Sequence, residues 1–294
     1  MGKVLIAMSG GVDSSVAAYL LKHSGWDCVG ATMTLYRNED IGISRSRTCC
    51  SLEDVEDARS VAFRLRIPYY VFNFSDEFRR QVMDRFADAY GQGRTPNPCI
   101  DCNRYLKFRH LYDRAALLGC DTIATGHYAR IERENGRYLL KKALDASKDQ
   151  SYVLYMLTQE QLAHTQFPLG SLHKAETRQL ADSLGFFNAR KPDSQDICFV
   201  PDGDYAAFIR RHSGKADTPG DFVDESGRIL GRHKGIAHYT IGQRKGLGIP
   251  SNQPLYVKAI DPKSNQVVLS GNDALFSRQL TGGNFNWIAW EAPP

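Results

Sequence analysis

The segment Ser9-Gly-Gly-Val-Asp-Ser-Ser15 constrains the fold of this chain more than any other feature. It follows a short apolar run, Lys3–Met8, of the kind that forms a buried strand in a parallel sheet, and it precedes a helix-compatible segment, Val16–Leu21. Two glycines allow a sharp turn that brings backbone N–H groups close to a ligand, and the helix N-terminus adds a positive dipole end. The pattern therefore predicts a phosphate- or pyrophosphate-binding loop at a strand–helix junction.

This loop differs from two common phosphate-binding motifs. It lacks the Gly-Lys-[Ser/Thr] ending of a Walker A loop and the spacing of a G-x-G-x-x-G fingerprint. A lone Ser-Gly-Gly is often only a glycine turn beside a helix cap, but the full string at this junction disfavours that interpretation. It resembles the PP-loop of ATP pyrophosphatases, which cleave ATP to AMP and pyrophosphate while they adenylate a substrate. The resemblance implies ATP with Mg²⁺ as cofactor, and Asp13 as a helper for the magnesium ion.

Strand and helix signals alternate through the first half of the chain. Because parallel strands need crossover connections, this alternation predicts an α/β fold with a parallel sheet and helices on both faces. The further strand signals are Asp27–Leu35, Pro68–Phe74 and Asp121–Gly126, and the helical signals are 55–65, Asp76–Tyr90 and Arg104–Leu118.

After about residue 200 the pattern changes. Helical periodicity fades, glycine and proline become frequent, and short alternating segments follow at Leu255–Ile260 and Gln266–Leu269. We therefore expect a PP-loop catalytic domain over 1–199 and a smaller β-rich domain over 200–276. Residues 277–294 are expected to begin an incomplete C-terminal β domain, with a strand within Gln279–Trp290.

Composition limits the class of protein. Hydrophobic residues make up 42% and charged residues 24% of the chain, which is typical of a folded globular protein. The formal charge of +4 permits a polyanionic partner without requiring one. No apolar run approaches the roughly 20 residues that span a bilayer, and the N-terminus does not look like a secretory signal, so we expect a cytoplasmic location.

Seven cysteines without the spacing of a secreted disulfide framework favour metal binding or catalysis. In Thr95-Pro-Asn-Pro-Cys-Ile-Asp-Cys-Asn103, a rigid Pro-x-Pro segment leads into a helix start that can lower the pKa of a thiol. Ser194-Gln-Asp-Ile-Cys-Phe199 places another cysteine in a polar turn. Cys28 and Cys120 are expected to be core residues. Cys49-Cys50, which follow Ser44-Arg-Ser-Arg47, are more typical of a surface loop than of a sulfur relay or an RNA contact.

Five strings in order make the resemblance more specific: SGGVDSS, TPNPCIDCN, GCDTIATGHYAR, KDQSYVL and SQDICF. Together they resemble the tRNA-specific 2-thiouridylase family over nearly the whole chain. The resemblance implies ATP-dependent 2-thiolation of the wobble uridine (U34) of tRNA, through adenylation of the base and sulfur transfer from a cysteine persulfide. It also implies two partners: the anticodon stem-loop of tRNA, and a cysteine desulfurase or sulfur-relay protein.

The same resemblance assigns site residues. Cys198 would carry the persulfide, Cys102 would help to release its sulfur and form a Cys102–Cys198 disulfide, and Cys99 occupies the position of an acid–base aspartate. The ATP site would comprise Ala7, Met8, Ser9, Gly10, Gly11, Val12, Asp13, Ser14, Met33 and Gly126. The tRNA contacts would comprise Asn97, Pro98, Cys99, His127, Lys148, Asp149 and Gln150.

Alternatives remain at this stage. Cys99, Cys102 and Cys198 could hold a [4Fe–4S] cluster with one open iron, although persulfide chemistry is preferred. A structural zinc ion lacks an obvious fourth ligand. A PP-loop amidating ligase would not need the cysteine pair, and a non-catalytic RNA-binding or iron–sulfur protein would not need an intact phosphate loop.

A basic segment in the second half suits RNA. Its side chains could contact phosphates, with Tyr239 stacking on a base, and this predicts a tRNA-binding role for the 200–276 domain. An ordinary solvated charge run is the competing interpretation. The segment contains Arg232, His233, Lys234, His238, Arg244 and Lys245, and Arg210-Arg211 and Arg190-Lys191 are expected to extend the same face.

Overall fold

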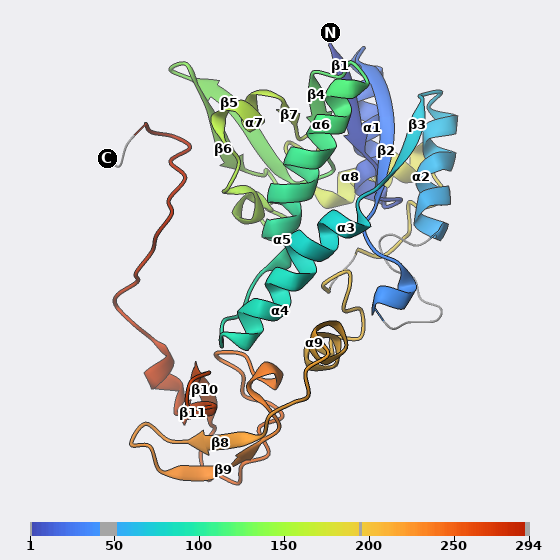
Figure 1. Cartoon of the computed structure of the whole chain (residues 1–294). Helices are drawn as coiled ribbons and strands as arrows, with labels where there is room; N and C mark the ends of the chain where they lie inside the picture. The colour runs from blue at the N-terminus through green and yellow to red at the C-terminus, as the bar shows by residue number, and fades with distance from the viewer. Residues whose placement is uncertain (1, 42–51, 194–195, 292–294) are drawn as a thin grey trace.

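The computed structural model describes residues 2–41, 52–193 and 196–291 (Figure 1). Its first domain is built on a five-stranded sheet in the order β3-β2-β1-β4-β7, and every pairing in it is parallel. The strands are β1 (Lys3–Ala7), β2 (Asp27–Thr34), β3 (Tyr69–Asn73), β4 (Thr122–Ala124) and β7 (Thr165–Gln166). The chain winds outward from β1 to β3 and then returns to the other side of β1. In such sheets, ligands bind beyond the carboxyl ends of the strands where the winding reverses, here between β1 and β4.

Both faces of this sheet are covered. Val4 and Ile6 of β1 lie in a core cluster with residues of α1 (Val12–His23), α2 (Leu52–Arg64) and α8 (Lys174–Ser183). Leu5 lies in the other core cluster, with Phe78, Phe86 and Leu106 from the helical segments of the opposite face. Successive residues of one strand thus enter different cores, which is why the run reads as continuously apolar. The predicted α/β class is confirmed.

Two long helical runs cross the second face. The first comprises α3 (Ser75–Phe78), the π-helical segment η2 (Arg79–Met83) and α4 (Asp84–Gly91), as predicted for Asp76–Tyr90. The second comprises α5 (Pro98–Asp101), the π-helical segment η3 (Cys102–His110) and α6 (Leu111–Leu117). It begins earlier than the predicted Arg104 because the Asn97 side chain accepts a hydrogen bond from the Cys99 N–H and caps the helix.

Several elements were not predicted. The hairpin of β5 (Ala129–Glu134) and β6 (Arg137–Lys142) turns at Asn135-Gly136, where both residues have positive φ. The expectation that helices fade after residue 200 was wrong for residues 205–213, which form α9 (Tyr205–Ser213). The Asp204 side chain caps this helix, and burial of Phe208 holds it against the core. The other elements that were not individually predicted are α7 (Gln159–Ala163), α8, β7, the strands Gly220–Val223 and Ile229–His233, and the short 3₁₀ turns Asn38–Ile41, Ser151–Leu154, Ile236–His238 and Asn272–Leu275.

The second domain is rich in β structure, as expected. Its sheet has the order β10-β11-β8-β9 and encloses a small core that includes Phe222, Val257 and Val267. The strands are β8 (Gly220–Val223), β9 (Ile229–His233), β10 (Tyr256–Asp261) and β11 (Gln266–Ser270), so the two predicted alternating segments are confirmed as β10 and β11.

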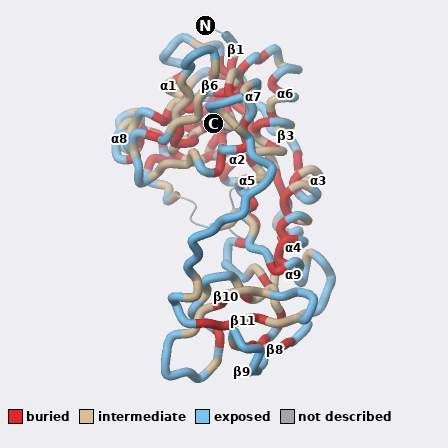
Figure 2. The backbone as a smooth tube through the Cα atoms, turned by 90° about the vertical axis from the view of Figure 1, so that its left-hand side faces the viewer, coloured by how far each residue is buried: buried red, intermediate tan, exposed pale blue. Residues whose placement is uncertain are grey.

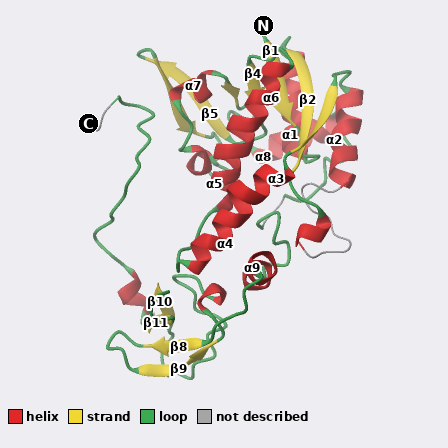
Figure 3. Ribbon diagram, viewed as in Figure 1, coloured by secondary structure: helices red, strands yellow, loops and turns green. Residues whose placement is uncertain are grey.

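The expected strand within Gln279–Trp290 is wrong, because none of the described residues 277–291 forms a strand (Figure 3). This largely exposed segment runs from the second domain back to the first (Figures 1 and 2). The carbonyl groups of this segment accept hydrogen bonds from side chains and not from a neighbouring strand: Arg137 donates to Trp287 O and Ile288 O, each at 3.3 Å. Among the described helices, none has the length and apolar character required to cross a bilayer.

Candidate nucleotide and cysteine site

The loop between β1 and α1 lies at the sheet edge where the winding reverses. Gly10 has φ +73°, and a Cβ atom on it would lie 2.4 Å from the carbonyl oxygen of Asp54. A Cβ on Gly126, which follows β4, would lie 2.8 Å from the Ser14 nitrogen. Both positions therefore require glycine for steric reasons, and β4 approaches the loop closely. The loop residues expected to bind ATP are thus brought together with Gly126.

Hydroxyl groups fix the shape of this loop. Ser14 Oγ accepts a hydrogen bond from the Ser9 N–H at 3.1 Å and donates one to Gly11 O at 3.1 Å. Ser15 Oγ also donates to Gly11 O, at 2.9 Å. The expected lining residues Ala7 and Met33 lie at the ends of the adjacent strands, and the Met8 N–H donates to Ala31 O at 2.8 Å. The loop is therefore set before any ligand arrives.

Asn188 is a site residue that the sequence did not reveal. Its buried side chain donates to Gly10 O and to Ser15 Oγ, each at 2.9 Å. Its Oδ1 has no hydrogen-bond partner among the residues that the structure describes. It lies 178 positions from Gly10 along the chain, so no local pattern signals the contact.

Asp13 is engaged by a cation of the protein. Lys174 Nζ lies 2.7 Å from each Asp13 carboxylate oxygen, and the Tyr128 hydroxyl donates to Oδ1 at 3.0 Å. Lys174 also contacts Asp193 at 2.8 Å. Partial burial alone would raise the pKa of Asp193, but the ammonium groups of Lys174 and Lys148 lower it to about 2. The carboxylate predicted to assist magnesium is thus an ion-pair partner in this structure.

Cys99 and Cys102 lie on the capped helix, as the Pro-x-Pro segment predicted. Pro98 occupies the first helical turn, and Asn97 Oδ1 accepts the Cys99 N–H at 3.0 Å. Cys99 and Asn97 are exposed, whereas Cys102 is half-buried at the start of η3 and packs against the larger core cluster. Irregular π-helical turns of this kind are frequent at functional sites.

Cys198 lies in a tight turn packed against the same core cluster as Cys102. The Val200 N–H donates to Ile197 O at 2.8 Å and closes the turn. Phe199 is 1% exposed, and its ring meets those of Phe78 and Phe86 edge to face. The helical face that bears Cys102 and the turn that bears Cys198 therefore share one packed interior.

The described cysteines form no disulfide, so the expected Cys102–Cys198 bond is not present in this structure. Nor do any three Cys, His, Asp or Glu side chains within 2–41, 52–193 and 196–291 lie close enough together to hold a metal ion. Cys99, Cys102 and Cys198 therefore do not present the ligand set that a [4Fe–4S] cluster requires. Cys28 and Cys120 are buried, as predicted, and burial raises the pKa of the Cys28 thiol to about 11. Cys49 and Cys50 lie outside the described residues.

His127 is buried instead of facing solvent. Its Nδ1 lies 2.7 Å from Thr125 Oγ1, and its ring lies between those of Phe108 and Phe167. Burial, with a smaller effect of Lys107, holds the pKa of His127 well below its usual range, so the ring is neutral. In this structure His127 supports the end of β4 and is not available to RNA.

The Lys148-Asp149-Gln150 motif also makes internal contacts. Lys148 pairs with Asp193 at 2.9 Å, Asp149 accepts the Ala143 N–H at 2.9 Å, and Gln150 accepts the Tyr128 N–H at 2.9 Å. These bonds hold the motif beside the residues that contact Asp13. All three residues are half-buried, and the expectation that they face tRNA stays a prediction.

Only part of the basic segment is available to a ligand. Tyr239 and His233 are buried against Phe222, so base stacking by Tyr239 was a wrong expectation. The exposed members are Lys234, Arg244, Lys245 and Arg232, of which Arg232 pairs with Asp221 at 3.0 Å. The 244–255 loop borders a cavity of about 530 Å³.

The other predicted basic residues make ion pairs. Lys191 pairs with Asp54 at 2.5 Å, beside the phosphate loop of the first domain and not on the basic face of the second. Asp217 pairs with His238 and Arg210, each at 3.0 Å. Arg211 donates to Ile41 O at 2.7 Å, and Arg190 lies 3.8 Å from Asp182.

Comparison with known proteins agrees with this arrangement. A family model described as the tRNA methyl transferase HUP domain matches residues 2–202, and one described as the tRNA methyl transferase PRC-barrel domain matches 206–271. A tRNA-specific 2-thiouridylase MnmA from Clostridioides difficile is 52% identical over 98% of this chain and 80% of its own length. The enzyme of that name from Lachnoclostridium phytofermentans is 53% identical over 99% of this chain and 82% of its own length.

A solved structure of a 4-thiouridine synthetase–RNA complex with bound ATP has a TM-score of 0.46 and 21% identity, covering 68% of this chain and 45% of that one. This likeness is too distant to bear on the function. The two relatives span nearly the whole chain, and the phosphate loop, the Cys102 helix and the Cys198 turn all lie within the matched length. The chain belongs to the tRNA-specific 2-thiouridylase family.

Proposed function

We propose that this chain is an ATP-dependent tRNA-uridine 2-sulfurtransferase that thiolates the wobble uridine (U34). The observation that carries the proposal is one α/β domain in which a phosphate loop lies at the winding reversal and two half-buried cysteines pack on a common core. The family models are described by methyl transfer, but the relatives with about half of their residues identical are named for 2-thiolation. A PP-loop combined with a cysteine pair suits thiolation.

ATP binds at the Ala7–Ser14 loop, with Met33 and Gly126 at its borders. The N-terminus of α1 and the loop N–H groups stabilise the phosphates. The uridine C2 oxygen attacks the α-phosphorus, the bond to pyrophosphate breaks, and the uridine N3 releases its proton. Adenylation is necessary because the C2 oxygen is otherwise a poor leaving group.

Sulfur transfer follows from the two cysteines. The terminal sulfur of a Cys198 persulfide attacks C2, and the Cys102 thiolate attacks Cys198 Sγ. The Cys198–sulfur bond breaks with its electron pair on the transferred sulfur, a Cys102–Cys198 disulfide forms, and AMP leaves as C2=S is completed. An external thiol reductant then restores both thiols. Cys99, exposed on the same helix, takes the acid–base role.

Magnesium accompanies ATP as a counterion for the phosphates. Asp13 could assist it only after exchanging its contacts with Lys174, which occupies both carboxylate oxygens. Lys174 would then be able to contact the phosphates, so a single exchange of partners would give Asp13 the magnesium ion and Lys174 the phosphates.

The tRNA substrate requires access to a loop base. Unstacking the wobble uridine costs a few kcal/mol and is cheapest in an anticodon loop. The 1–199 region performs catalysis, with Asn97–Cys99 at the target base, and the exposed cations of 200–276 grip the stem. A cysteine desulfurase or sulfur-relay protein charges Cys198, and a tRNA substrate favours a cytoplasmic setting.

The proposal is tested by anaerobic 2-thiouridine formation with ATP, Mg²⁺, unmodified tRNA and a persulfide donor. We expect product that requires ATP and maps to position 34, and at least about a thousandfold loss in Cys198→Ser, because the nucleophile is removed. Cys28→Ala is the matched control, since its thiol stays protonated in the core. ATP-dependent product from Cys198→Ser, or product at another uridine, would contradict the assignment.

A further inference from the structure

Tyr36 makes a long-range contact with the cysteine assigned to carry sulfur. It lies two residues beyond the end of β2, and its side chain is 4% exposed. Its hydroxyl donates a hydrogen bond to the backbone carbonyl of Cys198 at 2.6 Å, across 162 positions of the sequence. No motif in the sequence singles out this residue, and nothing in the proposed reaction uses it directly.

The Tyr36 hydroxyl gives the Cys198 carbonyl a hydrogen-bond partner that the turn itself does not provide. The turn closes through Val200 N and Ile197 O, so the Cys198 carbonyl takes no part in the closing bond. On the other side of the cysteine, Phe199 is fixed by rings at 5.6 Å (Phe78) and 5.3 Å (Phe86). Cys198 is therefore held from both sides, by the Tyr36 hydroxyl on its carbonyl and by the buried ring of its neighbour.

The anchor is continuous with the ATP site. Tyr36 follows β2, which bears Met33 and pairs with β1, and β1 leads directly into the phosphate loop. A strand held by hydrogen bonds to its neighbours keeps the residues at its end in a fixed position. Reactions between bound groups are sensitive to displacements of about 1 Å. The end of β2 thus connects the strand beside the phosphate loop to the turn that bears Cys198.

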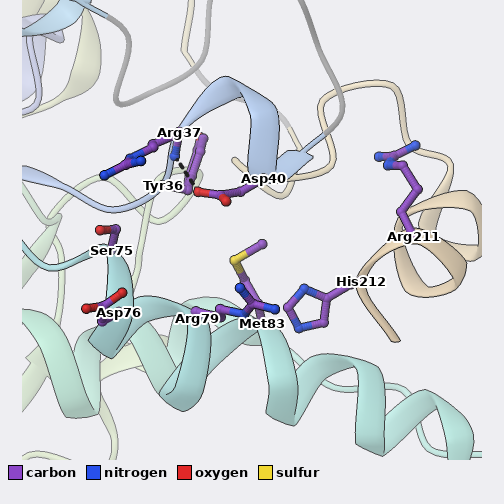
Figure 4. A pocket seen from close by; sticks show the side chains of 9 residues that line it. All are labelled: Tyr36, Arg37, Asp40, Ser75, Asp76, Arg79, Met83, Arg211 and His212. Carbon is purple, nitrogen blue, oxygen red and sulfur yellow. Dashed lines mark hydrogen bonds between the residues drawn. The ribbon is translucent and has the colours of Figure 1, made fainter. Parts of the chain in front are cut away.

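The surroundings of Tyr36 indicate what loss of its hydroxyl would do. Tyr36 lines a polar cavity of about 300 Å³ together with Arg37, Asp40, Arg79 and other residues (Figure 4). Water from this cavity could replace the lost hydrogen bond to the carbonyl without fixing its direction. The fold would then persist while the turn loses its fixed orientation.

We propose that Tyr36 is a positioning residue for sulfur transfer: its hydroxyl orients the Cys198 turn so that the persulfide reaches C2 of the adenylated uridine. This inference rests on the proposed function. It predicts an effect on the sulfur step, because the hydroxyl bonds to the backbone of the cysteine that carries the sulfur.

The test compares Tyr36→Phe with Tyr90→Phe. Tyr90 is a close match: it is 5% exposed, its ring packs in the same core at 5.0 Å from the ring of Phe86, and its hydroxyl engages Thr240. In single turnovers with preloaded persulfide, we expect Tyr36→Phe to slow 2-thiouridine formation about tenfold, with pyrophosphate release and the KM for tRNA within about twofold. Tyr90→Phe should match the wild type in all three.

A second measurement does not depend on thiolation. Iodoacetamide labelling of Cys198, followed by peptide mass spectrometry, should be several-fold faster in Tyr36→Phe than in Tyr90→Phe. Equal labelling and equal sulfur transfer in the two variants would overturn the inference, as would a matching fall in pyrophosphate release, which indicates general damage. Absence of product from the wild type would refute the proposed function, and the inference with it.

Discussion

The phosphate loop and the Cys198 turn are both held in a fixed shape, but by different kinds of contact. The loop is shaped mainly by bonds between residues three to five positions apart and by one glycine with positive φ. The turn is oriented by a hydroxyl 162 positions away and by rings from two helical segments. The first site is encoded largely in one contiguous string, with Asn188 as a distant support, whereas the second is assembled by packing. Substitutions in the first should disturb binding directly, whereas those around the second should disturb geometry while leaving the fold intact.

The largest effect is expected for Gly10→Ala in the phosphate loop. A Cβ at this position meets both an unfavourable φ and the Asp54 carbonyl at 2.4 Å, so we expect about 2–4 kcal/mol of destabilisation and at least about a tenfold loss of ATP affinity. Urea unfolding and calorimetric ATP titration measure the two effects.

Gly25→Ala is the control for that variant. It has φ +84° but nothing within 4 Å of the added Cβ, so it carries only the conformational cost of about 1 kcal/mol. Equal destabilisation by the two substitutions would show that close packing of the loop contributes nothing.

A smaller effect concerns Asp193, which links the charge network of Lys174 to the segment that precedes the Cys198 turn. Its pKa is lowered to about 2, so the carboxylate stabilises the fold above its ordinary pKa of 3.8, and this contribution disappears as the pH falls through 2. Asp193→Asn should therefore cost about 1–2 kcal/mol at pH 6, and the cost should shrink toward zero near pH 2. Chemical unfolding of both proteins across this range measures it. A difference independent of pH would exclude an ionic origin.

The smallest expected effect extends the comparison to the second domain. Arg244→Gln with Lys245→Gln removes two exposed cations, and we expect tRNA affinity to fall about three- to tenfold, with a salt slope smaller by about 1–2. Lys263→Gln, also exposed on this domain, is the control. Filter binding at several salt concentrations distinguishes them. A fall as large for Lys263→Gln would indicate general charge attraction instead of a defined contact surface.

The same contrast explains what could be predicted from the sequence. The strands β1 to β4, β10 and β11, the Asp76–Tyr90 helix and the loop were predictable because their signals are local: apolar or alternating runs, helical spacing and glycine turns. Asn188, Lys174 and Tyr36 were not, because each acts through one side chain on a residue more than 150 positions away.

Two residues that were expected to contact RNA are buried, which the sequence did not indicate. His127 and Tyr239 were expected at RNA because a motif and a basic neighbourhood surround them, yet both are enclosed by aromatic rings. A residue's chemical type indicates what it can do, but tertiary packing determines whether it meets solvent. The hairpin at Asn135-Gly136 is different, since its turn carried a readable signal that was missed.

The return of the 285–290 segment to the first domain has a mechanical consequence. Asn286 donates to Tyr155 O and Leu157 O, and Gln159 donates to Ile288 O, so the chain grips the first domain again after leaving the second. A domain joined to its neighbour at one end only can pivot about that connection. The second domain is joined before β8 and held again after β11, and between these the Tyr90 hydroxyl engages Thr240. Any rearrangement of the second domain relative to the first must therefore strain at least one of these three connections.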